Sequence, residues 1–165
     1  MLETIFDRRS IRKFKDIPVE QDKLKTLVRA GFYAPSGRGL LPWHFVVIDE
    51  RALLDQIAGC NPNMPMAKTA AAGIVVCADT QVSPDWWQAD CAAAAENILL
   101  AAKELGLGTC WCAIQPNPTR MANFEELLHY PQGIVPFCFI AVGYPDEEKE
   151  NPDRVKDERV HINRW

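Results

Sequence analysis

The chain has 165 residues, of which 48% are hydrophobic and 24% are charged. This size suits one domain with a buried core, so we expect residues 1–165 to form a single domain. The net charge of −4 at pH 7 argues against general binding to nucleic acid or to anionic membranes, because both require a basic surface. Proline and glycine interrupt the longest uncharged stretch, which argues against a membrane span.

The first half of the chain alternates helices with single strands. A helix begins after Pro18 and ends at the breaker cluster Ala34–Gly37, with apolar residues at helical spacing between them. The run Trp43–Ile48 predicts a strand, and a short helix follows over residues near 53–57. The continuously apolar run Gly73–Ala78 predicts a strand that is covered on both faces.

The second half repeats this alternation. The longest predicted helix runs from about Trp86 to Glu104, and Thr109–Ile114 predicts the next strand. Asn117 is a helix cap with proline at the first helical position after it, and Ile134–Val142 predicts a fourth strand. Helices and single strands interleave, which indicates an α/β or α+β fold around one sheet.

The six cysteines fall mostly within apolar runs, where cysteine behaves as a small core hydrophobe. They are Cys60, Cys77, Cys91, Cys110, Cys112 and Cys138. Charged residues close to Met1 leave no apolar export signal, so we expect reduced thiols in the cytoplasm. Cys110 and Cys112 are the closest pair, but no second pair or nearby histidine completes a zinc site. We therefore predict structural thiols and no bound metal.

Five of the 18 basic residues lie in one stretch of eight, namely Arg8, Arg9, Arg12, Lys13 and Lys15, with Ser10 among them. Guanidinium groups bind phosphate through paired hydrogen bonds, and a serine hydroxyl adds a donor. The stretch is therefore a candidate phosphate site. A solvated basic turn explains the same composition equally well. A nucleic-acid arm is less favoured, because no further basic segment follows.

Two glycine-containing segments are the next candidates for a binding site. The rigid loop Ala34–Trp43, with two prolines and two glycines, lets the backbone approach a flat ligand, although it also fits a plain helix-to-strand connection. Gly106 and Gly108 end a helix and precede a strand, the reverse of a dinucleotide-binding loop. His44 and His129 have no partner at motif spacing, and no hydrolase motif is present.

Four blocks of this sequence together resemble the flavin-dependent nitroreductase family. They are Arg8–Phe14, the loop from Ala34 to Phe45, Ala95–Trp111, and Ile140–Pro145. The ending His161–Trp165 is similar to that of short members of the family. The blocks follow the family order and span nearly the whole chain. The resemblance implies an α+β fold with a central, mostly antiparallel sheet flanked by helices, and a homodimer with one FMN per subunit at the interface.

The resemblance also implies roles for particular residues. Arg8, Arg9, Ser10 and Arg12 would hold the phosphate and ribityl end of FMN, and Pro35, Ser36 and Gly37 would line the flavin. Cys112 and Ala113 match the strand end whose backbone N–H faces flavin N5. A basic residue of the C-terminal segment, Arg154 or in reserve Lys156, would complete the phosphate site. Gly39, also in the flavin loop, and Leu41 stand where the family commonly carries Asn and Gln.

The implied activity is electron transfer from NAD(P)H through the flavin to a nitroaromatic, a quinone or a similar acceptor, by a ping-pong mechanism. The cofactor carries this chemistry, so no catalytic acid or base is required of the protein. Two alternatives stay open. One is a flavin-binding or sensing protein without turnover, which the substitutions at Gly39 and Leu41 favour. The other is a specialised member of the family, such as a reductive dehalogenase.

The predicted helix over residues 89–102 is apolar nearly all round, with charges only at Asp90 and Glu96. A helix of that kind needs cover on every side. A homodimer packed through the long helix would provide it, and the tail that ends in Trp165 would wrap the neighbouring subunit. The alternative is the central core helix of a monomer.

Overall fold

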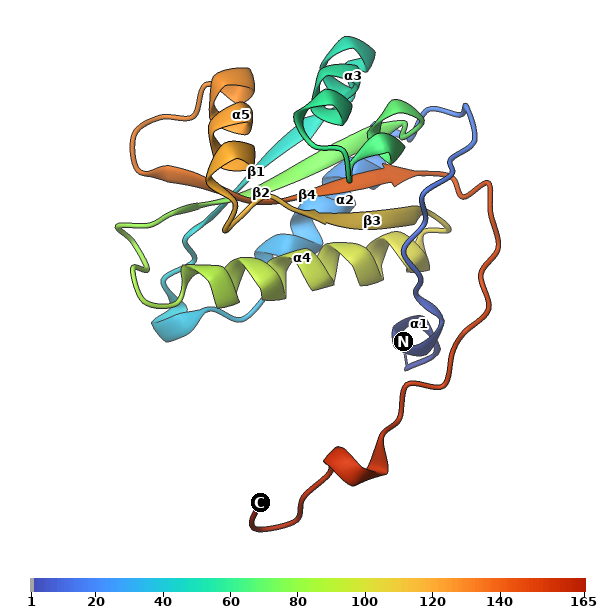
Figure 1. The fold of residues 1–165 in the computed structure, drawn as a ribbon, viewed down its shortest axis with the longest axis vertical. Coiled ribbons are helices and arrows are strands. Elements are labelled where there is room, and N and C mark those ends of the chain that lie inside the picture. Colours follow the sequence, from blue (N-terminus) through green and yellow to red (C-terminus); the bar gives the residue numbers. More distant parts are fainter. Residues whose placement is uncertain (1) are drawn as a thin grey trace.

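The computed structural model describes residues 2–165, which form one four-stranded sheet between two layers of helices (Figure 1). The strands are β1 (Trp43–Ile48), β2 (Ala72–Asp79), β3 (Gly108–Ala113) and β4 (Ile134–Gly143). They pair antiparallel in the order β1-β2-β4-β3, which leaves β1 and β3 at the edges. The prediction of a mostly antiparallel sheet flanked by helices is confirmed.

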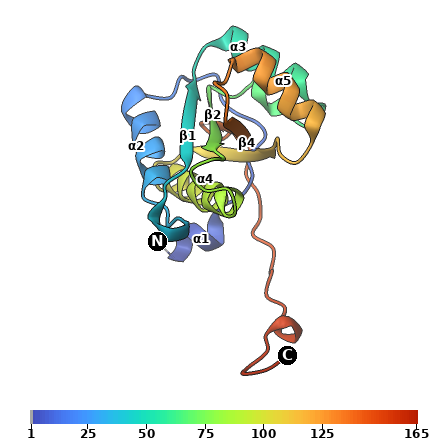
Figure 2. The same cartoon turned by 90° about the vertical axis from the view of Figure 1, so that its left-hand side faces the viewer.

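Helices α2 (Gln21–Phe32) and α4 (Trp87–Glu104) cover one face of the sheet. Helices α3 (Arg51–Cys60) and α5 (Pro118–Leu128) lie on the other face (Figure 2). A short helix, α1 (Leu2–Asp7), precedes the sheet below α4. Its six residues are too few to show a periodic apolar stripe, so the sequence did not predict it. No helix within residues 2–165 is long and apolar enough to cross a bilayer.

Strand β2 lies at the centre of both cores, as its continuous apolar run predicted. Side chains alternate between the two faces of a strand. Ile74 and Val76 therefore pack in the core beneath α4 with Ile98. Val75 and Cys77 face the opposite core, which contains Phe124 of α5.

The segment after β4 does not join either core. Residues 150–165 are exposed throughout, and the tail extends away from the sheet past α1 (Figure 1). The side chain of Asn151 donates a 2.7 Å hydrogen bond to Asp7. Beyond it, Val155, Val160, Ile162 and Trp165 expose 67–101% of their surface.

A matched pair of glycines tests the packing between β2 and the core that contains Phe124. A Cβ atom at Gly73 would meet the Phe139 ring closer than van der Waals contact allows, whereas one at Gly59 of α3 meets nothing within 4 Å. We expect Gly73→Ala to lower the free energy of unfolding by about 1–3 kcal/mol through overpacking. Gly59→Ala should leave it unchanged or raise it by up to about 1 kcal/mol. Urea unfolding of both variants measures the difference, and equal effects would contradict this packing.

Candidate functional site

The N-terminal basic segment, residues 8–13, passes along the open edge of the sheet. Ser10 forms a parallel bridge with Thr109 of β3, and the N–H of Ile11 donates a 2.8 Å hydrogen bond to the Thr109 carbonyl. Farther on, Phe14 pairs with Pro145 just after β4. The basic segment is thus fixed between the start of β3 and the segment that follows β4.

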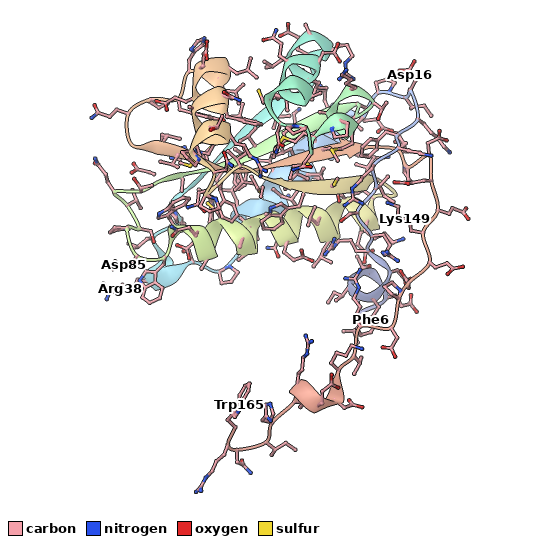
Figure 3. The ribbon with its side chains drawn as sticks, viewed as in Figure 1. Phe6, Asp16, Arg38, Asp85, Lys149 and Trp165 are labelled. Carbon is pink, nitrogen blue, oxygen red and sulfur yellow. The ribbon has the colours of Figure 1, made fainter. Side chains whose placement is uncertain are left out.

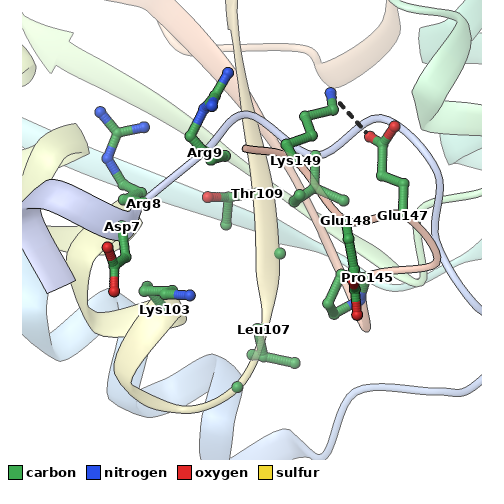
Figure 4. A pocket seen from close by; sticks show the side chains of 13 residues that line it. Asp7, Arg8, Arg9, Lys103, Leu107, Thr109, Pro145, Glu147, Glu148 and Lys149 are labelled. Carbon is green, nitrogen blue, oxygen red and sulfur yellow. Dashed lines mark ion pairs between the residues drawn. The ribbon is translucent and has the colours of Figure 1, made fainter. Parts of the chain in front are cut away.

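A cavity of about 380 Å³ opens beside this segment (Figure 4). Four of its lining residues are cationic, Arg8, Arg9, Lys103 and Lys149, and three are acidic, Asp7, Glu147 and Glu148. The Nη1 atom of Arg9 is buried without a hydrogen-bond partner. A buried guanidinium nitrogen without an acceptor is costly, and a bound anion would supply the acceptor. The cavity is therefore suited to a phosphate group.

Glu147 and Lys149 tie the C-terminal segment to the basic segment. One carboxylate oxygen of Glu147 accepts hydrogen bonds from the N–H groups of Arg12 at 2.5 Å and Lys13 at 3.3 Å. The Nζ atom of Lys149 donates to the Ser10 carbonyl at 2.8 Å and pairs with Glu147 at 3.1 Å. The N–H of Arg12 stabilises the charged carboxylate, and this lowers the pKa of Glu147.

The side chains of Arg8 and Arg12 take different paths. Arg8 donates from Nε to the carboxylate of Glu96 on α4 at 3.2 Å. Arg12 is exposed and does not line the cavity. The interaction with the Cys112 side chain and the positive charges of Arg12 and Lys149 lower the pKa of Cys110, whereas burial raises it. The positive charge around the basic segment therefore also reaches β3.

Only one of the two predicted N5-facing residues directs its N–H group away from the sheet. Groups alternate along an edge strand between the neighbouring strand and the open side. The carbonyls of Thr109 and Ala113 accept hydrogen bonds from Ile11 and Arg120, which lie outside the sheet. By this alternation the N–H of Ala113 points to the open edge, and that of Cys112 points to β4.

The loop of Pro35, Ser36, Gly37 and Gly39 lies at the opposite end of α4 (Figure 3). The buried carboxylate of Asp90 holds it there, accepting hydrogen bonds from the Gly37 N–H at 2.8 Å and from the Ser83 hydroxyl at 3.1 Å. Gly39 has a φ of +68°, which glycine tolerates without strain.

One chain therefore brings Arg8, Arg9 and Ser10 together but keeps the loop apart from them. Asp90 beside the loop and Lys103 in the cavity are 13 residues apart on α4, roughly 20 Å at the helical rise. Arg154 and Lys156 are exposed in the tail and do not line the cavity. Lys149 is the cation of the C-terminal segment that does.

Sequence reasoning missed four residues of this arrangement, namely Asp90, Lys103, Glu147 and Lys149. A carboxylate within an apolar helix was a signal for Asp90, because buried charges are normally paired or hydrogen-bonded. The other three had no local signal. Glu147 and Lys149 contact residues more than 130 positions earlier in the chain.

The contacts of Asp90 predict a measurable loss of stability. Asp90→Ala leaves the Gly37 N–H and the Ser83 hydroxyl without their acceptor, which should cost about 1–3 kcal/mol in the free energy of unfolding. Asp85 is exposed in the turn between Ser83 and α4, and Asp85→Ala should change the free energy of unfolding by less than about 0.5 kcal/mol. Chemical denaturation measures both variants. Similar losses would show that Asp90 does not act through these hydrogen bonds.

Comparisons with known proteins agree with this architecture. Residues 5–144 match the model of the nitroreductase family. An Archaeoglobus fulgidus protein, provisionally named an NADH dehydrogenase/NAD(P)H nitroreductase, is 39% identical over 99% of this chain and 98% of its own length. An FMN-dependent nitroreductase from Clostridium difficile superposes with a TM-score of 0.94 at 34% identity, covering 100% of both chains. The Vibrio harveyi NADPH:FMN oxidoreductase, complexed with NAD+, superposes at 0.87 with 28% identity over 99% of this chain and 77% of that one.

Proposed function

This chain belongs to the nitroreductase family, and on that basis we propose that it is an FMN-dependent NAD(P)H oxidoreductase. Its acceptors would be quinones, nitroaromatics or similar electron-poor compounds. The observation that supports this most directly is the cavity beside the basic segment, where Arg9 Nη1 has no partner. The phosphate of FMN would supply a hydrogen-bond acceptor for Arg9 Nη1.

The edge of β3 provides a path for the rest of the cofactor. From Thr109, beside the cavity, to Ala113 the strand rises roughly 13 Å. We place the phosphate with Arg8, Arg9 and the neighbouring Ser10, and the flavin ring toward Ala113. The outward N–H of Ala113 would then donate to flavin N5.

A second copy of the chain would complete this site. The loop of Pro35–Gly39 lies too far from the cavity to line the same flavin, whereas a neighbour related by a two-fold axis brings its own loop there. The outer face of α4 is available for this contact. Ala89, Ala92, Ala93, Glu96 and Leu100 share that face at helical spacing, and they are exposed or half-buried. We therefore propose a homodimer packed through α4.

FMN held in this site would supply the redox chemistry between the nicotinamide and the acceptor. The role of the residues of this chain is to bind the cofactor and to orient it. Arg8, Arg9, Lys103 and Lys149 would surround the phosphate, with Arg9 and Lys103 supplying the positive charge that is unpaired within the described part of the chain. The loop of a second copy would cover the flavin, and donor and acceptor would use the same open space in turn. For a quinone, one NAD(P)H and one proton yield one hydroquinone and one NAD(P)+, so the two substrates are consumed one to one.

Purification and turnover test the proposed function. We expect a yellow protein that retains FMN and that oxidises NADH or NADPH continuously when a quinone is added, with one hydroquinone formed per nicotinamide. A protein that holds FMN but does not turn over would instead be a flavin-binding or sensing protein. A protein that stays colourless after incubation with FMN would rule out both functions.

Charge placed on the outer face of α4 tests the dimer. Ala92→Arg puts a cation on the proposed interface, and Ala52→Arg puts one on the exposed surface of α3, on the other side of the sheet. Sedimentation at low micromolar concentration should give twice the 18.6 kDa chain mass for the wild type and for Ala52→Arg. Ala92→Arg should sediment as a monomer and lose FMN. A wild-type monomer that binds FMN would contradict the shared site.

All six cysteines of the chain are free thiols, and five of them are buried. Free thiols are typical of a reducing compartment. This supports a cytoplasmic location for the enzyme.

A further inference from the structure

We propose that Glu147 is a positioning residue for the phosphate-binding segment. It holds the backbone of residues 12 and 13, so that the neighbouring hydroxyl and guanidinium groups meet the FMN phosphate in a fixed geometry. This inference rests on the proposed function. The inference adds to the proposed function a residue that contacts the backbone of the phosphate-binding segment and contributes no positive charge.

The first support is the set of hydrogen bonds. Residues 12 and 13 follow the bond between Ile11 and β3, where the segment leaves the sheet edge. Their two N–H groups converge on one oxygen of Glu147. Residues 12 and 13 are exposed, so water can replace the carboxylate as an acceptor, but water does not hold the backbone in one place. Without this carboxylate the segment would gain conformational freedom, which binding would then have to remove.

The second support is that Glu147 is itself held in place. Its side chain is only 18% exposed, and Lys149, which is 23% exposed, pairs with it. Lys149 also donates a hydrogen bond to the Ser10 carbonyl. The pair therefore contacts the segment both at residue 10 and at residues 12 and 13. The backbone bond from Asp146 N–H to the Lys13 carbonyl, at 2.9 Å, fixes the adjoining chain. The carboxylate is therefore preorganised rather than a mobile surface group.

The third support is the sign of the charge. A carboxylate beside a phosphate site repels the phosphate, so the charge of Glu147 opposes binding while its hydrogen bonds favour it. Substitutions separate the two effects. Glutamine keeps an acceptor oxygen and removes the charge, aspartate keeps the charge and withdraws the acceptor, and alanine removes both. Glu148 supplies a matched control, because it lines the same cavity but forms no hydrogen bond to the segment within residues 2–165.

The experiment titrates FMN and riboflavin separately into the full-length protein. Glu147→Ala and Glu147→Asp should raise the Kd for FMN about tenfold and leave that for riboflavin, which has no phosphate, within about twofold. Glu147→Gln and Glu148→Ala should bind FMN at least as tightly as the wild type. In the Arg9→Ala background the effect of Glu147→Ala should shrink, because a guanidinium group that the segment brings to the cavity is gone.

Hydrogen exchange without flavin gives an independent reading. The amides of residues 12 and 13 should exchange faster in Glu147→Ala, while those of β2 stay protected. Unchanged exchange, or an FMN affinity in Glu147→Ala equal to that in Glu148→Ala, overturns the positioning role. Equal losses for FMN and riboflavin overturn it also. If the wild type binds neither flavin, the proposed function fails. If the wild type binds FMN and the variants bind it equally well, only the positioning role of Glu147 fails.

Discussion

The packing of α4 against the sheet is the constraint on which the candidate site depends. Half of the buried residues of this helix are alanine or cysteine, which allow a close approach to the strands. Each end of the helix then fixes a different part of the site. Asp90 near its start holds the Pro35–Gly39 loop, and Glu96 and Glu104 farther along contact Arg8 and Thr4 of the N-terminal segment. Because α4 separates these parts within one chain, the proposed function requires a second chain to bring them together.

Local signals in the sequence were sufficient to predict the sheet and its main helices. The apolar run of β2 indicated a strand buried on both faces, and β2 is buried along nearly its whole length. Asn117 caps α5 as predicted, its side chain accepting from the N–H of Arg120. The short helix α1 lacked such a signal. Contacts with α4, not its own pattern, hold it in place, since it contains no buried residue.

The site was predictable only in its local parts. Arg8, Arg9 and Ser10 are adjacent in the sequence, so their joint position followed from the pattern. The family resemblance pointed to Arg154, but an exposed tail imposes no position on its side chains within one chain. Lys149 is constrained because the backbone just before it pairs with the N-terminal segment. A contact of that kind depends on the arrangement of the strands and leaves no trace in local spacing.

The distribution of charge explains how an acidic chain can offer an anion site. Glu147 is already bound by two amides and by Lys149, and Arg8 is paired with Glu96. Of the four cavity cations, Arg9 and Lys103 form no ion pair within residues 2–165. The positive charge available to a ligand is therefore set by which groups are unpaired, and not by the net charge of the chain. A phosphate gains from both cations, whereas an uncharged flavin gains from neither. The proposed function therefore implies selectivity for FMN over riboflavin, which the local pairing of charges would produce.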